Sequence, residues 1–214
     1  MNPRRKLIQA CGIVAAALCL TGAPLAAQSV LDEWATVKAP PPPVLKPVTL
    51  DAKKTAYMVL DFRLAACTME TRQRCATALP HVQKLLTEAR AKGMMVVHTL
   101  TTNSKEESIP PALKPIAGEP VMAVAMDKMS APGLAESFKA KGIDTVLISG
   151  TSGNNAVMNT AVGAVLRGFK AIVPVDTMPS EGAYQEQSAI WQIANGSTLR
   201  ELATVTRSDM VTIK

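Results

Sequence analysis

The sequence is poor in the side chains that most often bind nucleic-acid bases and metal ions. Among 214 residues there are two Trp, two Tyr, three Phe and two His. So few aromatic rings argue against binding by base stacking. His81 and His98 have no ligand-like spacing, and no Cys-x-x-Cys occurs. We therefore expect no metal site, and no motif in the sequence calls for a cofactor.

The N-terminal residues have the pattern of a secretory signal. Basic residues at 4–6 precede an apolar stretch over 7–20, and small residues follow as far as Ala27. The stretch of about 14 residues is shorter than the ~20 that a membrane-spanning helix needs. We predict a signal peptide over 1–27, cleaved after Ala27, rather than an uncleaved membrane anchor. The protein is then exported, to the periplasm or outside the cell, with no stable membrane insertion after cleavage.

Cleavage changes both the charge and the cysteine count. The net charge of +6 falls to +3, because three basic residues and no acidic ones precede residue 28. That excess is too small to indicate nucleic acid as a partner. Only Cys67 and Cys75 remain of four cysteines. In an oxidising compartment they are expected to form a short disulfide loop, the alternative being two unpaired thiols.

The mature chain divides into an arm and a domain. Residues 39–43 read Ala-Pro-Pro-Pro-Pro, which favours an extended polyproline conformation. We assign 28–54 to a Pro-rich arm or linker and 55–214 to one folded domain. Short apolar runs then alternate with segments of helical periodicity. The expected strands are 56–60, 94–100, 121–126, 145–149, 171–175 and 203–206, and the expected helices are 72–92, 133–141, 155–167 and 184–195. This alternation predicts an α/β fold with a parallel sheet covered on both faces.

Polar residues follow several of these strands, at the edge where α/β proteins bind ligands. Asp61 could be a buried functional carboxylate or an ordinary loop aspartate, and Lys128 could pair with it or be solvated. Segment 101–103 and Asp176 occupy similar strand-end positions. The turn 150–157 lacks both the dinucleotide fingerprint and the P-loop ending. Its free N–H groups suit an anion or a developing oxyanion, although a simple tight turn is equally consistent.

The sequence resembles the isochorismatase-like (cysteine hydrolase) family over about residues 55–210. The matching segments are Tyr57-Met-Val-Leu-Asp61, the helix and strand over 89–99, Ala140-Lys-Gly-Ile-Asp through Gly150, the turn 151–157 with the following Asn159-Thr-Ala161, and Gly168-Phe-Lys-Ala-Ile-Val-Pro-Val-Asp176. The resemblance implies a Rossmann-like three-layer α/β/α sandwich. Its six-stranded parallel sheet would have the strand order 3-2-1-4-5-6.

The resemblance also implies a set of site residues. The family's usual triad is Asp, Lys and Cys, and it maps onto Asp61, Lys128 and Ala156, so alanine stands where the nucleophilic cysteine is expected. The backbone N–H groups of Ser152 and Ala156 would form the oxyanion hole. A non-proline cis peptide would join Thr151 to Ser152.

The chain departs from the family pattern in ways that bear on function. It reads Asp61-Phe-Arg63 where many members have Asp-x-Gln, it has Gly153 in place of the turn threonine, and it lacks paired histidines after Thr99. Without a thiol at 156, nucleophilic attack on an amide by the usual route is unavailable.

Three readings of the function stay open. The chain could be a hydrolase of a small molecule without a cysteine nucleophile, with Asp61 as the general acid in vinyl-ether hydrolysis, as in true isochorismatases. It could be a catalytically inactive member with a binding or assembly role. Least favoured is Cys67 as a replacement nucleophile, since a disulfide to Cys75 would consume it. In each reading we expect a small-molecule substrate or ligand and a homo-oligomer.

Overall fold

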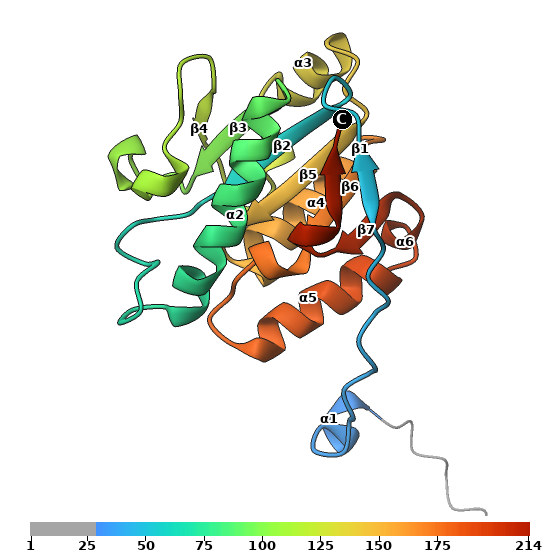
Figure 1. Ribbon diagram of the computed structural model, residues 1–214. Coiled ribbons are helices and arrows are strands. Elements are labelled where there is room, and N and C mark those ends of the chain that lie inside the picture. Colours follow the sequence, from blue (N-terminus) through green and yellow to red (C-terminus); the bar gives the residue numbers. More distant parts are fainter. Residues whose placement is uncertain (1–28) are drawn as a thin grey trace, which may run out of the picture. The chain divides into compact units, whose positions relative to one another are not determined.

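The computed structural model describes residues 29–214, so the predicted signal peptide lies outside the described residues (Figure 1). Two compact units can be separated, one ending at Pro40 and the other covering residues 41–214. The first unit contains the short helix α1 (Val30–Glu33). Within the described range, no helix combines the length and the apolar character needed to cross a membrane.

A six-stranded, all-parallel sheet forms the centre of the second unit (Figure 1). Its order is β4-β3-β2-β5-β6-β7. The strands are β2 (Thr55–Leu60), β3 (Met95–Leu100), β4 (Val121–Ala123), β5 (Thr145–Gly150), β6 (Lys170–Pro174) and β7 (Ala203–Thr206). Numbered along the chain, these six strands have the order 3-2-1-4-5-6. The predicted α/β fold and strand order are therefore confirmed.

Helices cover both faces of the sheet and complete three layers. The helices are α2 (Gln73–Ala91), α3 (Leu134–Ala140), α4 (Met158–Leu166), α5 (Ala183–Asn195) and the short α6 (Leu199–Leu202). One apolar core joins α3, α4 and α5 to the sheet, and a second core joins α2 to the opposite face. All residues of the central strands β2 and β5 are buried, as expected of parallel strands covered on both sides.

A second, two-stranded sheet extends the fold beyond the predicted domain. Residues of β1 (Val48–Leu50), in the segment assigned to the Pro-rich arm, pair in parallel with β8 (Val211–Ile213). Leu50 and Ile213 are buried in the same core as α2. Residues 48–50 thus pack with the folded unit, and the domain boundary at residue 55 stays a prediction. Three-residue strands carry almost no periodicity, and this ladder depends on a partner far away in the sequence.

Candidate active site

The predicted site residues converge on one cavity at the carboxyl ends of the central strands. The cavity has a volume of about 350 Å³ and is lined by Asp61, Lys128, Ser152 and Ala156, among others. Asp61 follows β2, Lys128 follows β4, and the other two residues follow β5. Two threonines of the predicted strand-end segment 101–103 also line the cavity. Since parallel strands end at the same edge of the sheet, the topology brings these residues together.

Asp61 is held in one orientation by its neighbours. Its φ of 55° lies in the left-handed region, which Asp tolerates better than most residues. Its backbone N–H donates to Thr99 O at 3.0 Å, and the Thr99 hydroxyl donates to Asp61 Oδ1 at 3.0 Å. The other carboxylate oxygen, Oδ2, lies 2.7 Å from Lys128 Nζ. Each oxygen therefore accepts one strong interaction, and the carboxylate is fixed beside the cavity.

Lys128 is one of the most deeply buried charged residues in the described part of the chain, with 1% of its surface exposed. Besides the Asp61 contact, its Nζ donates to Val124 O at 2.7 Å and approaches Leu100 O at 3.5 Å. Three acceptors thus meet the three N–H groups of the ammonium. A buried charge is tolerated when it is paired and hydrogen-bonded in this way. The strand β4 ends at Ala123, so Val124 lies just beyond it and its carbonyl oxygen is available to accept from Lys128 Nζ.

The turn that carries Lys128 is fixed by helix α4. The Lys128 N–H donates to Thr160 Oγ1 at 3.1 Å. Asp127 begins the turn: its Oδ1 accepts from the Met129 N–H at 2.9 Å, and its Oδ2 accepts from Arg167 at 3.0 Å. Gly163 lies directly beneath the Asp127 carboxylate, and a Cβ there would overlap it. The small-residue face of α4 therefore positions the lysine.

The segment after β5 has the geometry that the resemblance implies. The Thr151–Ser152 peptide bond is cis. A π-helical turn over Gly153–Val157 then leads into α4. Within residues 29–214, no backbone carbonyl outside this turn accepts from the amides of Ser152 or Ala156. The Ala156 side chain is 3% exposed and presents a methyl group at the cavity wall.

Two arginines line the cavity that sequence reasoning did not assign to the site, Arg63 and Arg72. Arg72 Nη1 donates to Thr151 Oγ1 at 2.6 Å, and its Nη2 lies 3.0 Å from Glu181 Oε1. Arg63 was noted in the sequence only as a departure from the Asp-x-Gln pattern. No sequence signal pointed to Arg72, whose place beside Thr151 depends on how the loop after β2 folds back.

That loop is closed by a disulfide. Cys67 and Cys75 are bonded, with Cα atoms 4.8 Å apart. Both are buried, and Cys75 lies in the first turn of α2. Cys67 is not among the residues that line the cavity. Bonded to Cys75 and absent from the cavity lining, Cys67 does not have the setting of a nucleophile.

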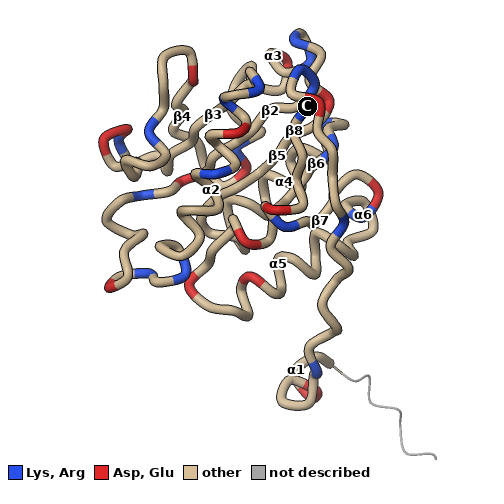
Figure 2. The backbone as a smooth tube through the Cα atoms, in the orientation of Figure 1, with Lys and Arg blue, Asp and Glu red and all other residues tan. Residues whose placement is uncertain are grey.

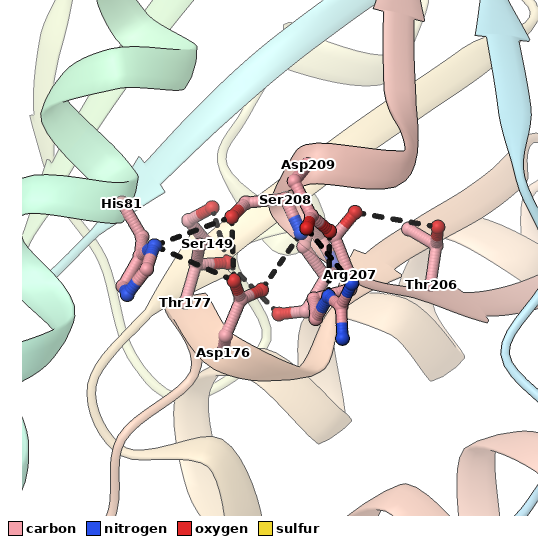
Figure 3. A network of polar contacts seen from close by, with 9 residues as sticks. His81, Ser149, Asp176, Thr177, Thr206, Arg207, Ser208 and Asp209 are labelled. Atoms are coloured by element: carbon pink, nitrogen blue, oxygen red, sulfur yellow. Dashed lines mark hydrogen bonds and ion pairs between the residues drawn. The ribbon is translucent and has the colours of Figure 1, made fainter.

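Asp176, another strand-end residue, has a structural setting rather than a place in the cavity (Figure 3). Its Oδ1 accepts from the Ser208 N–H at 2.8 Å, and its Oδ2 accepts from the Ser208 hydroxyl at 2.5 Å. His81 Nδ1 lies 3.6 Å from the same Oδ2 and 3.5 Å from Ser208 Oγ. The serine donates to the aspartate, and one histidine nitrogen faces both. This is not the arrangement of a Ser-His-Asp triad, in which the histidine stands between the other two.

Comparisons with known proteins give the family. The isochorismatase domain model matches residues 55–209. The chain belongs to the isochorismatase family. No curated protein matches the sequence.

Solved structures share the fold at low sequence identity. An isochorismatase family protein from Desulfovibrio vulgaris is 19% identical with a TM-score of 0.64, and the match covers 73% of this chain and 95% of that one. A cysteine hydrolase from Pseudomonas syringae is 18% identical with a TM-score of 0.64, covering 78% and 94%. N-carbamoylsarcosine amidase from Thermoplasma acidophilum is 21% identical with a TM-score of 0.60, covering 73% and 97%.

Proposed function

We propose that this protein is a hydrolase of a small molecule that works without a cysteine nucleophile, with Asp61 and Lys128 as its candidate catalytic pair. The observation that carries the proposal is the buried contact of 2.7 Å between these residues beside an open cavity. An ammonium and a carboxylate are costly to bury together when hydrophobic residues would serve the fold as well. Their position at the ligand-binding edge of the sheet supports a chemical role.

The chemistry that suits this site is acid-catalysed hydrolysis of a vinyl ether. In the proposed cycle the Asp61 carboxylate first takes up a proton and then gives it to the vinyl carbon, so that an oxocarbenium ion forms. Water adds to that ion, and the proton that the water loses returns to the Asp61 carboxylate. Collapse of the resulting hemiketal releases an alcohol and a ketone. The enzyme is unchanged after the cycle, and no step needs a thiol at position 156.

A second candidate function is binding without catalysis. The observation that favours it is the Ala156 methyl group at the cavity wall, at the position where the family resemblance places the thiolate. The open cavity is compatible with both functions, because an enzyme and a binding protein each need space for a small molecule. It weighs only against a protein that has lost all ligand contact, since such a protein would gain stability from filling that space with side chains.

The experiment compares four proteins on two substrate classes. The natural protein, Asp61→Asn, Ala156→Cys and the control Asp51→Asn are assayed against simple amides and a simple vinyl ether. Asp51 is an exposed turn residue at the opposite end of β2 and serves as the matched control. We expect the natural protein and the control to cleave the vinyl ether, and Asp61→Asn to lose at least about a hundredfold in rate, the usual contribution of a general acid.

The outcomes separate the two functions. Amide turnover by Ala156→Cys that also requires Asp61 would show a preserved site with one part missing. Amide hydrolysis by the natural protein, abolished in Asp61→Asn, would contradict the argument from the absent thiol. If no form turns over either class, the binding role is the better account.

We also propose that the protein works in an oxidising compartment. The buried Cys67–Cys75 disulfide supports this, because such bonds persist in exported proteins and are rare in reducing cytosol.

A further inference from the structure

The charged groups that line the cavity are unbalanced. Among the described residues that line the cavity, Asp61 is the single acidic one, and its charge is already balanced by Lys128. Arg63 and Arg72 add two positive charges. Elsewhere in the described residues, basic and acidic residues alternate along the backbone (Figure 2). The cationic excess is therefore a local property of the cavity.

The two arginines have different settings. Arg72 is fixed, because its guanidinium donates to Thr151 Oγ1 at 2.6 Å and pairs with Glu181 at 3.0 Å. That Glu181 side chain is 70% exposed, so it neutralises the arginine only weakly. Arg63 is exposed, and no acidic residue in the described part of the chain forms a salt bridge with it. One guanidinium is thus held beside the cis peptide, and the other is free to meet a ligand.

The loop that carries both arginines is anchored on either side of Arg72. The disulfide joins Cys67 to Cys75, and the Leu64 N–H donates to Ser108 O at 2.7 Å. Holding the backbone in place lowers the entropy lost when a ligand orders these side chains.

We propose that Arg63 and Arg72 form an anion clamp and that the ligand of this cavity carries a carboxylate. A planar guanidinium offers two parallel N–H groups that match the two oxygens of a carboxylate. Arg63, whose donors are uncommitted, binds the carboxylate, and Arg72 supplies a fixed positive charge next to Ser152. The inference rests on the proposed function only in using the same cavity, and it concerns binding rather than turnover.

The test is a calorimetric titration of the full protein with three probes. Benzoate and benzamide have the same shape and differ in charge, and inorganic phosphate is an anion of different geometry. We expect benzoate to bind at least about tenfold more tightly than benzamide, the factor that one charge-assisted hydrogen bond supplies. Phosphate should bind more weakly than benzoate.

Three variants test which arginine is responsible for the preference for benzoate over benzamide. Arg63→Gln should weaken benzoate about tenfold and leave benzamide within about twofold, and Arg72→Gln should act in the same direction. Arg200→Gln removes an exposed arginine outside the cavity and should change neither. Arg63 forms no salt bridge in the described chain, so Arg63→Gln keeps the test valid even if Arg72→Gln fails to fold.

Several results would overturn the clamp. Benzoate that binds no better than benzamide, including no detectable binding of either, contradicts it, as does an Arg63→Gln variant with unchanged benzoate affinity. Phosphate binding that exceeds benzoate binding would contradict the carboxylate assignment. Benzoate binding that depends on Arg63 in a protein with no hydrolase activity would support the clamp while the proposed hydrolysis fails. Turnover of a vinyl ether by a protein whose benzoate affinity does not change in Arg63→Gln would support the proposed hydrolysis while the clamp fails.

Discussion

Replacing Lys128 by Met removes a buried ammonium group and leaves a flexible apolar side chain of similar reach in its place. The Asp61 carboxylate, 7% exposed, would then keep only the Thr99 hydroxyl, at 3.0 Å, among its side-chain partners. The carbonyl groups of Val124 and Leu100 would lose a donor as well. The variant therefore leaves a buried charge without its counter-ion. Removing one partner in this way destabilises a protein much more than replacing both partners by apolar residues.

The expected loss is about 3–5 kcal/mol in the free energy of unfolding, the usual cost of removing one partner of a buried ion pair. For a unit of this size each kcal/mol lowers Tm by about 2–4 °C, so we expect a fall of about 10 °C. The Asp61→Asn change should cost less on its own, because the ammonium keeps two carbonyl acceptors. The double variant should be more stable than the sum of the single effects predicts, by about 1–3 kcal/mol.

Urea unfolding followed by circular dichroism measures these values, with linear extrapolation to water. Lys141→Met is the control, because Lys141 is exposed and forms no salt bridge in the described chain, and it should stay within about 0.5 kcal/mol of the natural protein. A cost below about 1 kcal/mol for Lys128→Met would be typical of a solvated surface pair. That result, or additivity in the double variant, would refute the description of Asp61 and Lys128 as one coupled buried pair.

Three further changes test other parts of the structure. Gly163→Ala should lower the free energy of unfolding by about 1–3 kcal/mol, because the new methyl group overlaps the Asp127 carboxylate, and an unchanged urea midpoint would contradict this packing. Thiol titration of the denatured, unreduced mature protein should find no free cysteine, since Cys67 and Cys75 are bonded, and two titratable thiols would contradict the disulfide. Burial lowers the pKa of His98 below its usual 6.5, so the unfolded chain takes up a proton that the folded protein does not. Stability should therefore fall as the pH drops below about 6.5, and His98→Gln should show a shallower decline in Tm, whereas parallel profiles would rule out His98 as a source.

The strands of the sheet could be predicted because short local stretches of the sequence identify each of them. Each central strand is a short, almost wholly apolar run, and glycines such as Gly93 and Gly142 mark the ends of the intervening helices. The expected contact of Asp61 with Lys128 is present at 2.7 Å, because both residues follow strands that end at the same edge. Their catalytic role stays a prediction.

The rest of the site depends on long-range placement that no local pattern encodes. Arg72 reaches Thr151 because the loop after β2 folds back across the end of β5. The strand β1 exists because β8 is available as a partner, and three residues alone favour no conformation strongly. Hydrophobic periodicity reports which face of an element is buried, and it contains no information about which distant side chain lies opposite.

The β1–β8 ladder has a consequence for the order of assembly. β1 is synthesised before any strand of the main sheet, and β8 follows all of them. β1 therefore has no partner until β8, which follows the whole six-stranded sheet in the sequence, is available. Closing such a long loop is slow compared with forming neighbouring parallel units. Leu50 and Ile213, both buried in the core beside α2, are expected to pack there together only after β8 has paired with β1. A fragment cut at residues 55–209 would lack both strands, and the face of the sheet that they cover would be exposed to solvent.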